Sequence, residues 1–430
     1  MLQLFRRERV LPRAHDLRHT YDVVIIGAGV HGLATAYYLG KEHGITNVAV
    51  LEKSYLGAGN SGRNTAILRA NYRTPEGIPF FAASLELYEQ LSQELGWNVL
   101  FSQCGHITLA HTDSAMAGLH LRAETNELYG VENRVLDREE LGQLVPALDL
   151  SDRPRYEILA ALYNPPGGII RHDAVVWGYA RACDRMGIEI HPLTEATEIR
   201  VSGTAGNGRA NVAPIPGTSP VATGEASRGR VTGVLTNRGE IATRAVVNCT
   251  AGWATEVSRL AGVDLPIVTQ PLQACVTEPL KPFLDKVIVS ANLHVYVNQT
   301  DRGELVIGAE VDPYQSYSMS GTLPTLEQMA SYTLELFPQL HNVKVLRQWA
   351  GICDMTPDYS PIIGGVEGLD GFYQDVGWGT YGFKAGPIAG KCLAELIATR
   401  KIPELIEPFA LSRFRDARLV GEKAAAAVSH

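Results

Sequence analysis

Residues 21–39 decide the fold of this chain: Tyr21-Asp-Val-Val-Ile-Ile-Gly27-Ala-Gly29-Val-His-Gly32-Leu-Ala-Thr-Ala-Tyr-Tyr-Leu39. The apolar run before the first glycine predicts a strand buried on both faces, and the residues after the third glycine have helical spacing. A second buried strand, Asn47-Val-Ala-Val-Leu-Glu52, follows a glycine-containing turn. Together these segments predict a β-α-β unit that binds a dinucleotide.

Each glycine of this motif has a physical reason. Gly27 allows the tight turn after the strand, Gly29 lets a pyrophosphate approach the backbone, and Gly32 lets the helix pack closely on the strand. The helix then directs its free N–H groups and the positive end of its dipole at the pyrophosphate. Glu52 ends the second strand, where a carboxylate accepts hydrogen bonds from a ribose.

Composition restricts the class of protein. The 430 residues are 45% apolar and 20% charged, which is the balance of a folded globular protein. A net charge of −8 without a basic tract disfavours binding to nucleic acid or to an anionic membrane. No apolar run approaches 18 residues, so we expect no transmembrane helix. The six cysteines form no C-x-x-C pair and no secretory signal begins the chain, so we expect a reducing cytoplasm.

The remaining chain predicts a second glycine-rich turn and a second domain. The strand Gly371-Phe-Tyr-Gln-Asp-Val376 leads into Gly377-Trp-Gly379-Thr-Tyr-Gly382-Phe-Lys384 before a helix, so another cluster of backbone N–H groups faces a ligand. Alternating residues in 266–311 predict an antiparallel sheet. Residues 203–230 predict a flexible insertion, and residues 1–19 an arm that packs on a partner or on its own domain.

Two longer motifs make a family visible. They are Gly59-Asn-Ser-Gly-Arg-Asn-Thr-Ala-Ile-Leu-Arg69-Ala-Asn-Tyr72 and Arg171-His-Asp-Ala-Val-Val-Trp-Gly-Tyr-Ala-Arg-Ala182. With the two glycine-rich turns and the strand Val246-Val-Asn-Cys-Thr-Ala-Gly252, they resemble the D-amino-acid oxidase class of flavoproteins. Within that class the chain resembles the beta subunit of heterotetrameric sarcosine oxidase from Tyr21 onward, apart from residues 203–230.

This resemblance implies an α/β fold with a Rossmann-like FAD domain and an α+β substrate domain on a mixed sheet. We expect the FAD domain in 20–90, 165–265 and 345–415, and the substrate domain in 91–164 and 266–344. The family oxidises N-methyl amino acids such as sarcosine by hydride transfer to non-covalent FAD. The resemblance also implies a second flavin, FMN, held covalently at His172, and an alpha subunit and small subunits that complete a hetero-oligomer.

The resemblance also implies which residues form the site, by their positions in the matching motifs. Arg69 and Lys384 match the carboxylate clamp, which suits a guanidinium fork and a compact ammonium. His294 and Tyr296 are expected on one face of a strand beside the substrate, although a structural histidine there is equally compatible. The expected cofactor-binding residues are Gly27, Gly29, Gly32, Glu52, Lys53, Asn60, Ser61, Arg63, Asn64, Thr65, His172, Gly252, Gly377, Gly379, Thr380, Gly382 and Lys384.

Two departures from monomeric relatives matter. Val306 falls where those oxidases have an oxygen-activating lysine, so electrons are expected to leave through a second centre. Cys353 falls where they attach FAD covalently, although a buried thiol usually acts as a small apolar group. The alternatives are a dehydrogenase of proline, N-methylglutamate or another N-alkyl amino acid, a stand-alone D-amino-acid or glycine oxidase, and an electron-relaying scaffold. A plain NAD dehydrogenase fits least.

Overall fold

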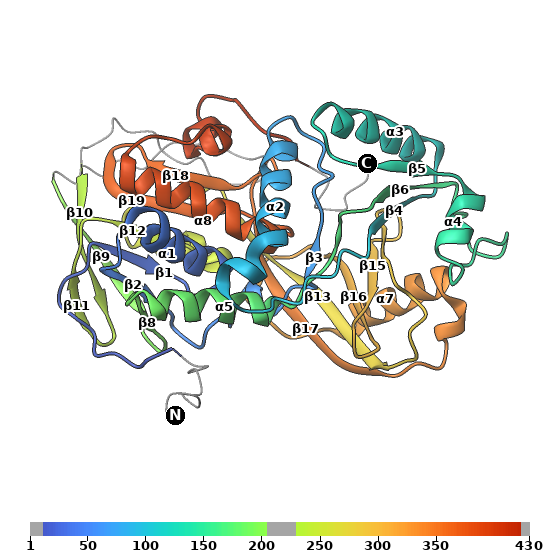
Figure 1. The fold of residues 1–430 in the computed structure, drawn as a ribbon, viewed down its shortest axis with the longest axis horizontal. Coiled ribbons are helices and arrows are strands. Elements are labelled where there is room, and N and C mark those ends of the chain that lie inside the picture. The colour runs from blue at the N-terminus through green and yellow to red at the C-terminus, as the bar shows by residue number, and fades with distance from the viewer. Residues whose placement is uncertain (1–11, 204–228, 423–430) are drawn as a thin grey trace, which may run out of the picture.

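The computed structural model describes residues 12–203 and 229–422, and these form two sheets side by side (Figure 1). The first sheet is mainly parallel. Its strand order is β11 (Gly239–Ala242), β10 (Gly229–Thr236), β19 (Leu369–Val376), β12 (Val246–Asn248), β1 (Val23–Ile26), β2 (Val48–Leu51) and β8 (Glu189–His191), with β9 (Ala196–Ser202) on β10 and β18 (Ile362–Val366) on β19. The predicted β-α-β unit is present, since β1 pairs in parallel with both β2 and β12.

The second sheet is mainly antiparallel and lies in the right half of Figure 1. Its order is β17 (Val345–Met355), β13 (Val268–Pro279), β16 (Glu304–Val311), β15 (Val295–Gln299), β14 (Val287–Ser290), β4 (His106–Ala110), β6 (Ala160–Asn164) and β5 (Arg134–Leu136). Only β14 and β4 pair in parallel within this sheet as described. The strands β3 (Ile67–Leu68) and β7 (Gly168–Ile169) pair with each other in a short two-stranded sheet that joins neither of the two large sheets.

Helices cover both sheets. The helices around the first sheet are α1 (Val30–His43), α2 (Gly77–Leu95), α5 (His172–Arg185), α6 (Ala254–Arg259) and α8 (Gly382–Thr399), while α3 (Asp113–Leu128), α4 (Arg138–Leu144) and α7 (Leu323–Leu336) accompany the second. The helices α1 and α8 approach very closely because Gly386 and Gly390 have no Cβ. A Cβ on Gly390 would lie 2.6 Å from the Thr35 backbone nitrogen.

The predicted fold class is confirmed, and one domain boundary needs adjustment. Strand β17 falls in the segment 345–415 that we expected in the FAD domain, yet it pairs with β13 of the second sheet along its length. We propose to move the boundary to the end of β17. The predicted insertion lies almost entirely outside the described residues. The described part of the N-terminal arm contacts its own domain, where Arg18 pairs with Glu189 at 2.8 Å.

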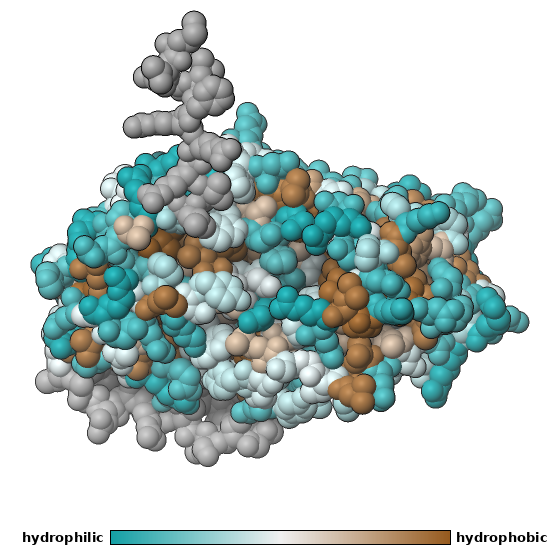
Figure 2. Space-filling model, turned by 90° about the horizontal axis from the view of Figure 1, so that it is seen from below, coloured by the Kyte–Doolittle hydropathy of each residue, from teal (hydrophilic) through white to brown (hydrophobic). Residues whose placement is uncertain are grey.

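The surface carries hydrophilic and hydrophobic side chains together. On the face shown in Figure 2, hydrophobic residues gather in separate clusters among hydrophilic ones. Within the described ranges, no helix has the length and apolar character needed to cross a membrane. The six cysteines all lie in those ranges as free thiols.

The segment after α8 is held by a buried ion pair. The Arg413 guanidinium donates to both carboxylate oxygens of Asp358, at 2.8 and 3.0 Å, and to the Ser360 carbonyl at 2.8 Å. Asp358 also accepts the backbone N–H of Val420 at 3.0 Å. Both charged groups are almost completely buried, so each depends on the other for compensation.

Arg413→Ala is expected to lower the free energy of unfolding by about 3–5 kcal/mol, because the Asp358 charge is then buried without its partner. Arg415→Ala is the matched control, since Arg415 forms its ion pairs at the surface and such pairs contribute about 0–1 kcal/mol. Denaturant unfolding checks both variants. Equal losses in the two variants would contradict the assigned role of the buried pair.

Candidate active site

The first glycine-rich turn places α1 tightly against the end of β1. Gly27 has φ of 110°, which favours glycine. A Cβ on Gly32 would lie 2.0 Å from the Gly27 carbonyl oxygen, so only glycine permits this contact. Val30, the first residue of α1, donates its N–H to the Ser61 hydroxyl at 2.9 Å. The result is a helix N-terminus that faces open space beside bare backbone, which is the geometry of a phosphate site.

Glu52 follows β2 and stands beside this turn. Its carboxylate accepts the backbone N–H of Ala28 at 3.1 Å and that of Ser54 at 2.8 Å. Burial raises the pKa of Glu52 while those two donors oppose the shift. Two oxygens offer about four acceptor sites, so the carboxylate retains capacity for ribose hydroxyls.

The segment 59–64 connects the two sheets. The Asn60 side chain donates to the Ile352 carbonyl at 2.7 Å and accepts the Ile352 N–H at 2.8 Å, so it pairs with β17 as a backbone would. Trp349, also in β17, donates to the Arg63 carbonyl at 2.7 Å. These bonds fix the wall of the site where the two domains meet, a role that the motif alone does not reveal.

Asp354 of β17 fixes the second glycine-rich turn, which begins at Gly377, by accepting two of its backbone N–H groups. Its Oδ2 accepts the Gly377 N–H at 2.6 Å, and its backbone carbonyl accepts the Gly379 N–H at 3.2 Å. Its Oδ1 is buried and has no hydrogen-bond partner within the described chain. Burial raises the pKa of the Asp354 carboxyl to about 6, against the opposing effect of nearby N–H donors and His31.

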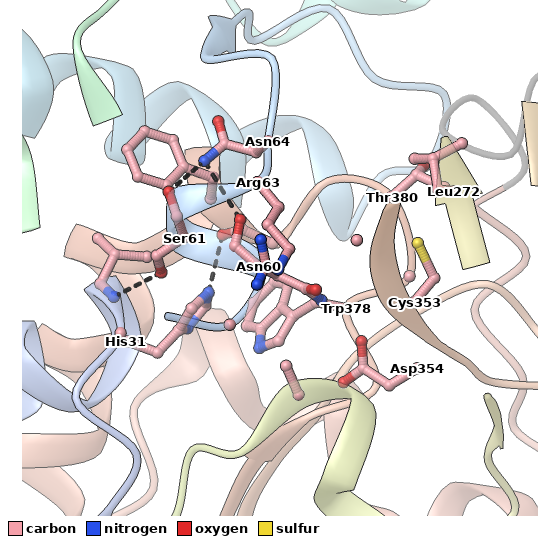
Figure 3. A pocket seen from close by; sticks show the side chains of 18 of the residues that line it. His31, Asn60, Ser61, Arg63, Asn64, Leu272, Cys353, Asp354, Trp378 and Thr380 are labelled. Atoms are coloured by element: carbon pink, nitrogen blue, oxygen red, sulfur yellow. Dashed lines mark hydrogen bonds between the residues drawn. The ribbon is translucent and has the colours of Figure 1, made fainter. Parts of the chain in front are cut away.

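His31 joins the two turns, and sequence reasoning missed it. Its ring lies beside that of Trp378 (Figure 3), with the two ring centroids 4.7 Å apart. Its Nδ1 lies 2.9 Å from Asp375 Oδ1, and its Nε2 lies 2.8 Å from the Gly382 carbonyl oxygen. Both neighbours are acceptors, so the ring satisfies both contacts only when both nitrogens carry hydrogen. Burial disfavours the imidazolium, but the Asp375 carboxylate and these bonds raise the pKa of His31 overall. Trp378 donates to the same carboxylate at 2.7 Å.

Both turns open into one cavity of about 780 Å³ that extends between the two sheets. This volume is within the range of about 300–1,000 Å³ that is usual for ligand sites. The second sheet contributes residues of six strands, mostly alternate ones, as expected for one face of a sheet. They are His106 and Thr108 of β4, Leu272 and Ala274 of β13, Val289 of β14 with Ala291 just beyond it, Tyr296 of β15, Ala309 and Val311 of β16, and Gly351 and Cys353 of β17.

One end of the cavity is strongly cationic. Arg69 Nη1 donates to the backbone and side-chain oxygens of Asn71 at 2.9 and 3.1 Å, and Arg122 Nε donates to the same backbone oxygen at 2.7 Å. Two buried guanidinium groups therefore share one carbonyl. Burial and the charge of Arg69 lower the pKa of Lys384. Such a concentration of buried positive charge favours the binding of an anionic ligand.

The structure brings most predicted site residues to this cavity. The lining residues are Gly27, Gly29, Glu52, Lys53, Asn60, Ser61, Arg63, Asn64, Thr65, Arg69, Tyr296, Gly379, Thr380, Gly382 and Lys384. Three predicted glycines shape the backbone behind it instead: Gly32, Gly252 and Gly377. A Cβ on Gly252 would lie 2.5 Å from the Ile352 side chain, so this glycine allows close packing of β17.

The predicted strand placement of His294 is wrong. Strand β15 begins at Val295, and His294 lies in the preceding turn with φ of 49°. Alternation along a strand therefore does not apply to it, and it is not among the cavity-lining residues, whereas Tyr296 is. Burial raises the pKa of the Tyr296 hydroxyl, which keeps it in the neutral, hydrogen-bond-donating form.

His172 begins α5 and lies outside the cavity lining. Burial lowers the pKa of its imidazole, while the neighbouring Asp173 carboxylate opposes the shift. The ring is therefore neutral near pH 7. Helix α5 packs against the segment Asn60–Gly62, of which Asn60 and Ser61 line the cavity, so the helix that carries His172 lies beside the predicted FAD site.

Comparisons with known proteins agree with this geometry. The family model described as FAD dependent oxidoreductase matches residues 22–396. The sarcosine oxidase beta subunits of Rhodobacter capsulatus and Rhizobium meliloti are 43% and 42% identical, over 95% and 96% of this chain and 92% of each relative. The crystal structure of L-proline dehydrogenase from P. horikoshii aligns with a TM-score of 0.82 at 28% identity, covering 94% of this chain and all of that one.

The chain belongs to the FAD dependent oxidoreductases, in the family of sarcosine oxidase beta subunits. The glycine cradle and Glu52 fit the cofactor of this family: the helix N-terminus would hold the pyrophosphate and the carboxylate the adenosine ribose. The prediction that the chain is a FAD-dependent oxidoreductase is therefore confirmed.

Gly32→Ala is expected to abolish most FAD binding, because the added methyl group meets the Gly27 carbonyl and forces α1 away from β1. Gly118→Ala is the control: it lies in α3 with no atom near the added Cβ, and it should stabilise the helix by about 0.5–1 kcal/mol. The measurement is the FAD absorbance retained per chain after gel filtration. Full retention by the Gly32 variant would show that the close approach is not needed.

Asp354→Asn is expected to change how stability depends on pH. The folded protein holds the Asp354 proton with a pKa of about 6 against 3.8 ordinarily, so ionisation makes folding less favourable as pH rises through this interval. The stability of the variant relative to wild type should therefore grow by about 3 kcal/mol between pH 4 and pH 7. Unfolding in denaturant at both pH values checks this, and a pH-independent difference would contradict it.

Proposed function

We propose that this chain oxidises a secondary amino acid, of which sarcosine is the simplest N-methyl example, as the beta subunit of a hetero-oligomer. The observation that carries the proposal is the joining of a flavin cradle to a buried cationic end in one cavity. The naming of its relatives as subunits of sarcosine oxidase supports the substrate class and the assembly.

The cationic end is suited to a carboxylate. A guanidinium presents a fork of N–H donors that matches two carboxylate oxygens, and an ammonium adds a compact charge. Arg69 is preset for this task, because Asn71 holds it from one side and the Tyr72 ring lies 4.3 Å from its guanidinium carbon. A clamped carboxylate fixes the orientation of the adjacent carbon and amine. Bound FAD would supply the hydride acceptor.

The second glycine-rich turn and the N-terminus of α8 would act on the bound cofactor, whereas the cationic end acts on the substrate. The Gly382 backbone and the N-terminus of α8 present N–H groups and the positive end of a helix dipole to the cavity. The proton on His31 Nδ1 is held in place by the Asp375 carboxylate, 2.9 Å away. These groups favour negative charge in the cavity, which arises when a flavin ring is reduced.

We further propose covalent FMN at His172, with electrons passing on to oxygen or another acceptor. A neutral imidazole at the start of α5 provides a nucleophilic nitrogen, and its low pKa keeps it unprotonated near pH 7. The alpha subunit and further small subunits would cover this second flavin. The thiol of Cys353 is buried, which raises its pKa, so we retain FAD as non-covalent.

The argument from Val306 is weaker than the sequence indicated. Val306 is not among the lining residues, although its register partners Val276 and Asn298 place it on the same face of the sheet as Ala274 and Tyr296. Ala309 and Val311 of β16 do line the cavity, and neither carries a charge. The proposal that electrons leave through FMN therefore rests on His172 and on the beta-subunit relatives.

A second candidate is a dehydrogenase of proline or of another N-alkyl amino acid. The L-proline dehydrogenase structure favours it, because its TM-score of 0.82 extends over nearly all of this chain. Oxygen uptake and dye reduction by the purified complex, measured with sarcosine, L-proline, N-methylglutamate and glycine, separate these activities from a stand-alone glycine oxidase. Turnover with none of them would overturn the proposal.

Arg69→Gln is expected to lower kcat/KM for the preferred amino acid by about 100-fold, because each hydrogen bond to a charged group is worth about 1.5–3 kcal/mol. Arg134→Gln is a matched control at an exposed ion pair. Unchanged turnover in both variants would favour the electron-relaying scaffold. Peptide mass analysis after acid precipitation tests FMN separately: we expect the added mass on the His172 peptide of wild type and none in His172→Ala.

A further inference from the structure

His106 is a basic side chain of the cavity that the proposed function does not use. It begins β4, is only 2% exposed, and lines the cavity. Its Nδ1 is buried, with no hydrogen-bond partner in the chain as described. Buried polar atoms are nearly always hydrogen-bonded, so an imidazole that lines the cavity and keeps an unpaired ring nitrogen has hydrogen-bonding capacity that a ligand could use.

The position of His106 on the sheet supports this. The lining residues that the second sheet presents are mostly small and apolar, such as Ala274, Ala309 and Val289. Among those described residues, His106 is the one basic side chain, and Thr108 next to it on the same face is the nearest polar one along β4. This polar corner of a mostly apolar floor is suited to a polar group of the substrate.

The charges around His106 determine its form. Burial lowers the pKa of His106 first, and the positive charges of Arg69, Arg122 and Lys384 lower it further. The imidazole is therefore neutral near pH 7. Guanidinium and ammonium groups have donors only, whereas a neutral imidazole offers one acceptor nitrogen. His106 thus supplies an acceptor next to the residues that would clamp a carboxylate.

In an amino acid the amine nitrogen is one carbon away from the carboxylate. A carboxylate held by Arg69 and Lys384 therefore brings its amine N–H into the neighbourhood of these two residues, where an acceptor is needed. We propose that His106 accepts a hydrogen bond from the amine N–H of the substrate and thereby selects amino acids over other carboxylic acids. This inference rests on the proposed function and adds a substrate-contacting residue to it.

Two ligands of nearly equal shape test the contact without turnover. Pyrrole-2-carboxylate carries a ring N–H next to its carboxylate, and 2-furoate has an oxygen at the same place. Their dissociation constants for the FAD-loaded complex can be measured from the perturbed flavin absorbance. Wild type should bind pyrrole-2-carboxylate about tenfold more tightly, the value of one buried hydrogen bond.

His106→Leu should remove this preference and leave 2-furoate binding within about twofold of wild type. His106→Gln keeps an acceptor oxygen and should restore part of the preference. An unchanged preference in the leucine variant, or an equal loss for both ligands in both variants, would overturn the proposal and assign His106 a structural role. If wild type binds neither carboxylate, the clamp of the proposed function fails instead.

Discussion

The site depends on how closely α1 approaches the end of β1. The contact between Gly32 and the Gly27 carbonyl leaves no room for a side chain, and it directs the helix N-terminus into the cavity. A second close approach, of α8 to α1 through Gly386 and Gly390, brings the other glycine-rich turn to the same place. His31 then connects the two turns through Asp375 and the Gly382 carbonyl.

The two sheets contribute different chemistry. The first supplies bare backbone, helix N-termini and Glu52, which suit a cofactor of phosphates and ribose. The second supplies a mostly apolar floor. The positive charge at its end comes from Arg69 just after β3, Arg122 of α3 and Lys384 of α8, and it suits a small carboxylate. Hydrogen bonds between the two domains fix these surfaces relative to each other. Asn60 bonds to Ile352 of β17, and Asp354 of β17 accepts the Gly377 N–H. Neither sheet alone makes a site for oxidising an amino acid.

Much of this was predictable from local sequence, and the remainder was not, for physical reasons. Gly27, Gly29 and Glu52 could be found because a turn and a strand end impose residue types at fixed spacing. His31 was missed because its partner Asp375 is 344 residues away. His106 was missed because nothing around it in sequence shows that Arg69 and Lys384 surround it. His294 was misplaced because it has a positive φ and belongs to the turn, so the strand begins one residue later, at Val295.

The measurement that tests the account most directly is anaerobic mixing of the FAD-loaded complex with candidate amino acids while flavin absorbance is recorded. The account predicts saturable bleaching by an N-methyl or cyclic secondary amino acid, and no bleaching by the matching carboxylic acid without nitrogen. A flavin that stays oxidised with every secondary amino acid, yet is reduced by dithionite, would contradict the assignment of this cavity to amine oxidation.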